Sequence, residues 1–149
     1  MIARIVIALV ILVAVGVIAF VMRRRPPDAP PRDVYPVPKQ LDRADFRRPE
    51  AGWLVALFSS AACDSCRGLD DKLTPLESSD VAVCVIDAEH FGALHRRYDL
   101  AAIPTTVVAD HEGVVVRAFV GAFTATDLWA AVAELRNPGS TPEPDLGAL

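Results

Sequence analysis

Hydrophobic residues along this chain fall into one long run and four shorter ones. The long run, residues 5–22, reads IVIALVILVAVGVIAFVM and contains no charged residue. The shorter runs cover residues 53–58, 81–86, 105–109 and 114–120. Short runs that are almost wholly apolar and bounded by polar residues are typical of strands buried inside a sheet. The pattern therefore predicts four strands in a folded part that follows a separate apolar segment.

The segments between these strands predict helices. Asp87 can cap the helix that follows the second strand, and Pro75 is expected to end or bend the helix before it. Asn137, Pro138 and Gly139 form a stop signal after the last helix. The predicted helices lie at residues 41–46, 63–73, 88–98 and 126–136.

The order of these elements predicts an α/β fold. Strands and helices alternate in the first half, which favours parallel pairing with right-handed crossovers. The short connection at residues 110–113 instead predicts an antiparallel hairpin between the last two strands. We therefore expect a mixed central sheet flanked by helices.

The long apolar run at residues 5–22 predicts an N-terminal transmembrane helix and hence the lipid bilayer as a partner. About 20 apolar residues span the hydrocarbon core of a bilayer. A cleaved signal peptide usually has a shorter apolar region followed by a small-residue cleavage site. The run ends instead at Arg23, Arg24 and Arg25. A cleaved signal and a buried core helix remain as alternatives to a retained single-pass anchor.

Positive charge around this segment predicts its orientation. Only Arg4 precedes the run, whereas Arg23, Arg24, Arg25 and Arg32 follow it. Because Lys and Arg favour the cytoplasmic side, we expect the rest of the chain to face the cytoplasm. An extracytoplasmic location stays open as the alternative.

Composition divides the chain into four parts. Residues 1–25 form the anchor with its basic flank, and residues 26–40 form a Pro-rich linker that is expected to be extended. Residues 41–136 form the folded domain, and residues 137–149 form a flexible tail. The formal net charge of −4 carries no basic footprint for nucleic acid, and the linker could alternatively be a polyproline ligand.

Two of the three cysteines, Cys63 and Cys66, are spaced for thiol–disulfide chemistry. A cysteine where a helix begins faces unpaired N–H groups, which stabilise the reactive thiolate. Cys63 is therefore the candidate nucleophile, and Cys66 the more buried resolving thiol. An inert structural disulfide is the alternative. A metal site is not expected, because zinc usually takes four ligands and the chain has no second such pair; no cofactor is expected either.

Four features surround this pair in a recognisable order. They are an apolar strand leading into Cys63-Asp64-Ser65-Cys66, Val85-Ile86-Asp87 closing the next strand, Tyr98 followed by Ile103-Pro104-Thr105, and Val120-Gly121 before the last helix. Through these features, residues 41–135 resemble the thioredoxin family. The resemblance implies a thioredoxin-like fold, protein thiols or disulfides as partners, and a cis bond between Ile103 and Pro104. It also implies that Ile103 binds a substrate strand through its main chain.

The chain departs from the family pattern around the cysteines. Ala62 stands where the family usually has Trp, and Asp64-Ser65 replaces Gly-Pro. The family's buried Asp and a neighbouring Lys correspond to Leu57 and Val83, so the proton relay to the second cysteine is missing. Asp64 should also disfavour a thiolate next to it, which predicts a reducing or modest potential.

Two functions therefore remain in view. The first is a membrane-anchored thiol–disulfide oxidoreductase that exchanges disulfides with a protein partner. The second is a redox-inactive binding module that presents Ile103 and Pro104 to a membrane complex, with metal delivery as a remote third. The remaining thiol, Cys84, is expected to pack in the core, and a regulatory disulfide is the alternative.

Overall fold

The computed structural model describes residues 35–142 and 145–147. The predicted anchor at residues 1–25, and the linker up to residue 34, lie outside these residues. Within the described part of the chain, no helix is both long enough and apolar enough to cross a membrane. The prediction for residues 5–22 therefore stays a prediction.

A four-stranded mixed sheet forms the centre of the fold, as the sequence predicts. The strands are β1 (Trp53–Ser59), β2 (Val81–Asp87), β3 (Thr105–Ala109) and β4 (Val115–Val120). They lie in the order β2-β1-β3-β4. β1 pairs parallel with β2 and antiparallel with β3, and β3 and β4 form the expected antiparallel hairpin.

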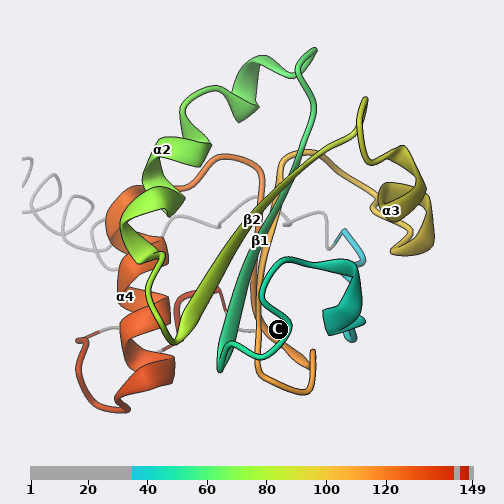
Figure 1. Ribbon diagram of the computed structural model, residues 1–149. Helices are drawn as coiled ribbons and strands as arrows, with labels where there is room; N and C mark the ends of the chain where they lie inside the picture. The colour runs from blue at the N-terminus through green and yellow to red at the C-terminus, as the bar shows by residue number, and fades with distance from the viewer. Residues whose placement is uncertain (1–34, 143–144, 148–149) are drawn as a thin grey trace, which may run out of the picture. The chain divides into compact units, whose positions relative to one another are not determined.

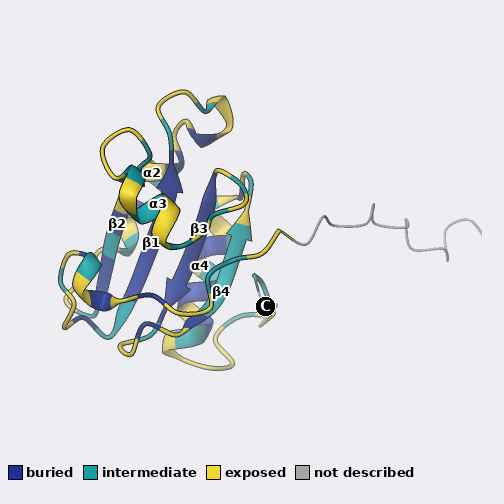
Figure 2. Ribbon diagram, turned by 90° about the vertical axis from the view of Figure 1, so that its right-hand side faces the viewer, coloured by how far each residue is buried: buried dark blue, intermediate teal, exposed yellow. Residues whose placement is uncertain are grey.

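Helices cover both faces of this sheet (Figure 1). α2 (Leu69–Leu73) and α4 (Ala125–Arg136) lie on one face, and their leucines pack against Val55 and Leu57. α3 (Gly92–Arg97) and the short 3-10 helix η1 (Arg43–Asp45) lie on the other, where Phe46 and Tyr98 pack against Phe58. The strand β1 is consequently buried along almost its whole length, which Figure 2 shows.

The predicted continuous helix over residues 63–73 is wrong. A 3-10 turn, η2 (Asp64–Cys66), comes first, and Gly68 then adopts a left-handed conformation at φ 70°. This conformation ends one helix and starts another, and glycine adopts it without a steric cost. α2 follows as a separate helix, and Pro75 lies within the next 3-10 turn, η3 (Thr74–Leu76), where a proline near the start is tolerated.

Asp87 does not cap a helix either. Its carboxylate accepts a hydrogen bond from the Glu89 N–H at 2.9 Å and lies 3.2 Å from His90 Nδ1. This side chain therefore stabilises a turn, and α3 begins only at Gly92. The helix predicted over residues 41–46 is likewise reduced to the short η1. The last helix is confirmed, and a capping box between Thr124 and Asp127 fixes its start.

Residues on either side of the predicted domain also contact the sheet. The Lys39 carbonyl accepts from the Val115 N–H at 2.9 Å, and an isolated β-bridge pairs Gln40 with Val114. Near the other end of the chain, the Gly147 carbonyl accepts from the Ala118 N–H at 2.8 Å. Ordered contacts therefore extend beyond residues 41–136.

The outer edge of β2 is covered in its first half by side chains. The Glu77 carboxylate accepts from the Val83 N–H at 2.9 Å, and the Ser78 hydroxyl accepts from the Val81 N–H at 3.2 Å. Arg48 donates to the Val81 carbonyl at 3.3 Å and forms an ion pair with Glu77 at 2.7 Å. Main-chain groups that a further strand would bind are thus already paired.

Tyr98 ties α3 to η1. Its hydroxyl donates to the Asp45 carboxylate and accepts from the Asp42 N–H at 3.0 Å. Arg97 adds ion pairs to the same two carboxylates, at 3.1 Å to Asp42 and 2.8 Å to Asp45. Burial, followed by the hydrogen bond to Asp45, raises the pKa of Tyr98 to about 12.

We predict that Tyr98 titrates late in the folded chain. Because the folded chain holds this proton more tightly than the unfolded chain, the stabilisation is complete below the ordinary tyrosine pKa and is lost as the pH rises through about 12. Tyrosinate absorbance should show a late step that Tyr98→Phe removes and Tyr35→Phe retains. Tyr98→Phe should also lower the free energy of unfolding by about 1–2 kcal/mol. A late step that survives Tyr98→Phe contradicts this assignment.

Candidate active site

The turn after β1 places Cys63 and Cys66 together. The Ala62 N–H donates to the Ser60 hydroxyl at 3.2 Å, and the Cys63 N–H donates to the Ser60 carbonyl at 3.0 Å. Cys63 and Cys66 are joined in a disulfide with their Cα atoms 5.4 Å apart. Cys63 is half-buried and Cys66 is buried, so Cys63 is the sulfur more open to an incoming group, as predicted.

The loop before β3 lies directly beside this pair. The Ile103–Pro104 bond is cis, which confirms the expectation drawn from the resemblance. The Ile103 carbonyl oxygen lies 4.0 Å from the Cys63 sulfur, although 40 positions separate the two residues in the chain. Ile103 is exposed, whereas Pro104 is buried and its carbonyl accepts from the Gly121 N–H at 2.8 Å. Three of the four segments that carry the resemblance therefore meet at one end of the sheet.

A thiolate at Cys63 would receive less stabilisation from a helix dipole, and less repulsion from Asp64, than the sequence predicts. Cys63 caps η2, a 3-10 turn of three residues, rather than a long helix, so the favourable helix dipole is small. The carboxylate of Asp64 is 88% exposed and is paired with Arg67 at 2.8 Å. Because the carboxylate is exposed and paired, its repulsion of a thiolate on Cys63 is screened.

A hydroxyl that the sequence reasoning missed lies beside the sulfur. The oxygen of Ser65 is 3.2 Å from the sulfur of Cys63. A disulfide sulfur carries no proton, so Ser65 is the donor in this state. A serine two positions after a cysteine at a helix start is the only sequence signal for this contact, and that signal is weak.

The positions of the missing relay are filled by apolar side chains. Leu57 is 1% exposed, and Val83 packs against the same cluster. Leu69 and Phe123 belong to this cluster as well. No carboxyl group occupies the place of the family's buried Asp, so any proton that leaves or reaches Cys66 must be exchanged by another route.

Cys84 lies within β2 and is not part of the Cys63–Cys66 disulfide. It is 7% exposed and belongs to the core cluster on the α3 face of the sheet. Burial raises the pKa of its thiol, which keeps it protonated and unreactive at neutral pH. The packing role predicted for Cys84 agrees with these contacts.

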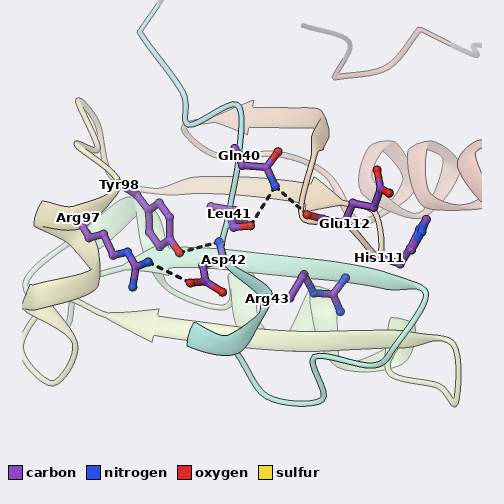
Figure 3. A pocket seen from close by; sticks show the side chains of 8 residues that line it. All are labelled: Gln40, Leu41, Asp42, Arg43, Arg97, Tyr98, His111 and Glu112. Carbon is purple, nitrogen blue, oxygen red and sulfur yellow. Dashed lines mark hydrogen bonds and ion pairs between the residues drawn. The ribbon is translucent and has the colours of Figure 1, made fainter.

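An open cavity of about 610 Å³ lies at the opposite end of the sheet (Figure 3). Its lining includes His111 and Glu112 in the β3–β4 turn, and β3 runs antiparallel to β1, away from Cys63. Asp42 and Arg97 in its wall are paired with each other. Among the described residues, no group of three or more His, Cys, Asp or Glu side chains could hold a metal ion. We assign this cavity no part in the chemistry of the cysteines.

Comparison with solved structures shows a thioredoxin-like fold. A thioredoxin mutant from Halobacterium salinarum matches with a TM-score of 0.51 and 26% identity over 58% of this chain and 76% of its own. The germline-specific thioredoxin Deadhead from Drosophila melanogaster matches with a TM-score of 0.51 and 26% identity over 58% of this chain and 84% of its own. No protein-family model and no curated protein matches the chain.

The fold and the cysteine pair together support thiol–disulfide redox chemistry in general terms. The sheet and its flanking helices have the thioredoxin-like arrangement. The cysteines have the CxxC spacing and stand at disulfide distance.

We predict that Cys63 and Cys84 differ strongly in reactivity once the chain is reduced. Native alkylation should modify Cys84 more slowly by roughly two orders of magnitude, because local opening must precede its reaction. Peptide mass spectrometry can follow the two cysteines separately in a Cys66→Ala background. After unfolding in denaturant the rates should become similar. Equal rates in the native chain would show that Cys84 is accessible.

Proposed function

We propose that this chain is a thiol–disulfide oxidoreductase that exchanges disulfides with a protein partner. Cys63 is the nucleophile and Cys66 the resolving thiol. The observation that carries the proposal is the half-buried Cys63, which is joined to Cys66 and whose sulfur lies 4.0 Å from the carbonyl oxygen of the exposed residue Ile103. A purely structural disulfide would gain nothing from this exposure.

The reaction would begin with the reduced pair. The thiolate of Cys63 attacks one sulfur of a partner disulfide, the partner S–S bond breaks, and its departing sulfur takes a proton from water. The thiolate of Cys66 then attacks the Cys63 sulfur and releases the second partner thiol. Two electrons have passed from the pair to the partner, and the reverse sequence oxidises a partner dithiol.

Ile103 is the proposed docking point for the partner chain. Apart from the contact with the Cys63 sulfur, its main-chain groups form no hydrogen bond to another residue of the described ranges 35–142 and 145–147. The neighbouring Pro104 carbonyl is already occupied by Gly121. An extended partner segment could therefore pair with Ile103 and bring its sulfur to Cys63, with Pro104 fixing the loop below.

The alternative function is a redox-inactive binding module, and the apolar layer at Leu57 and Val83 favours it. Because Leu57 stands at the place of the family's buried Asp, proton transfer to the resolving thiol lacks that relay. Such a module would bind a partner through the main chain of Ile103, and the disulfide would be a permanent structural cross-link. The two functions differ in whether the pair changes its oxidation state within the range found in cells.

A redox titration separates these functions. We expect the full-length chain, equilibrated in glutathione buffers, to show a reversible two-electron transition of Cys63 and Cys66 between about −120 and −300 mV. Cys84→Ala should titrate like the unchanged chain, and Cys66→Ala should accumulate a mixed disulfide with glutathione at Cys63. A pair that stays oxidised throughout this range would establish the binding module instead.

We further propose that residues 5–22 anchor the chain as a single-pass membrane protein with its folded part in the cytoplasm. The basic residues after this segment support that orientation. A membrane-impermeant thiol reagent added to intact cells should then leave reduced Cys63 unmodified until the membrane is permeabilised. In an Ile2→Cys variant, the new cysteine would lie on the other side of the proposed span, so the reagent should modify it in intact cells. Labelling of Cys63 in intact cells would place the domain outside.

A further inference from the structure

The sulfur of Cys63 has very few polar neighbours. Within the described residues its hydrogen-bonding contacts are the Ser65 hydroxyl at 3.2 Å and the Ile103 carbonyl at 4.0 Å. A carbonyl oxygen only accepts hydrogen bonds and cannot stabilise a negative sulfur. Ser65 is thus the one neighbour of the two that can donate to a thiolate.

The other sources of thiolate stabilisation are weak at this position. The turn that Cys63 caps ends at Arg67, and Gly68 separates it from α2, so no long helix points its N-terminus at the sulfur. Arg67 is the nearest cation in the turn, and its guanidinium is taken up by Asp64 at 2.8 Å. Both side chains are more than 80% exposed, so their field at the sulfur is screened by water.

We propose that Ser65 is a further catalytic residue, whose hydroxyl donates to the Cys63 sulfur and holds it as a thiolate. This inference rests on the proposed function, since it concerns the same sulfur. In the reduced pair, the Cys63 thiol ionises by releasing its proton to water, and the Ser65 hydroxyl keeps its own proton. Hydrogen bonds to a charged group are shorter and stronger than those to a neutral one, so the contact strengthens as the charge forms.

The same hydrogen bond would act when Cys63 is released. In the oxidising direction, a second partner thiolate attacks the partner sulfur of the mixed disulfide and Cys63 departs as a thiolate. A more stable thiolate leaves faster. A more stable thiolate is also a weaker nucleophile, so Ser65 favours neutral-pH reactivity at some cost in intrinsic reactivity. Because these two effects oppose each other, loss of the hydrogen bond should slow the reaction of Cys63 at neutral pH but not at high pH.

Alkylation of Cys63 across pH tests the proposal. Full-length Cys66→Ala chains carrying Ser65, Ser65→Ala or Ser65→Thr are treated with iodoacetamide from about pH 5 to about pH 10, and Cys63 modification is followed by mass spectrometry. At neutral pH, Ser65→Ala should react about three- to tenfold more slowly, as expected for the loss of a partly exposed hydrogen bond to a charge. At high pH its rate should meet or exceed that of the parent. Ser65→Thr should restore the parent profile.

The controls separate chemistry from folding and from access. Ser60→Ala removes a hydroxyl in the same turn that contacts the Ala62 N–H rather than the sulfur, and it should leave the profile unchanged. An unchanged profile in Ser65→Ala, or a rate lowered equally at every pH, would overturn the proposal. Iodoacetamide needs no disulfide partner, so the role of Ser65 is tested even if the redox titration rejects disulfide exchange.

Discussion

The antiparallel pairing of β1 with β3 is the constraint on which the candidate site depends. In this register Phe58 lies opposite Thr105, so the last residues of β1 and the first residues of β3 lie together at one end of the sheet. The turn that carries Cys63 therefore lies beside the loop that carries Ile103. Both strands bury different side chains on their two faces: in β1, Val55 and Leu57 pack in the cluster under α2 and α4, whereas Phe58 packs in the cluster under α3. A one-residue shift in register would exchange the two sets of side chains and disrupt the packing on both faces. The packing of the core thus holds the two halves of the site together.

The strands could be predicted from the sequence, and the reason is their burial. Runs such as residues 53–58 lie under helices on both faces, so they contain almost only apolar residues. The pairing of β1 with β3 was not evident, because an apolar run does not identify its neighbour. The resemblance to thioredoxins supplied the cis bond at Pro104, which apolar periodicity alone does not indicate.

The helices and the contacts of Cys63 were predicted less well, for local reasons. A glycine within a polar segment is compatible with a helix, and only the structure shows that Gly68 adopts a left-handed conformation. Asp87 could cap a helix or a turn, since its carboxylate accepts N–H groups in either setting. The Ser65 contact depends on a side-chain rotamer inside a 3-10 turn. Residue type and spacing do not determine such an arrangement.

The covered edge of β2 protects the chain against aggregation at high protein concentration. An edge strand with free main-chain groups invites strands from other molecules, which leads to aggregation. Here Glu77 and Ser78 already bind the N–H groups of Val83 and Val81, and Arg48 binds the carbonyl of Val81. A foreign strand would first have to displace an ion pair and three hydrogen bonds. These side chains thus hinder the edge strands of two copies of the protein from pairing along this stretch.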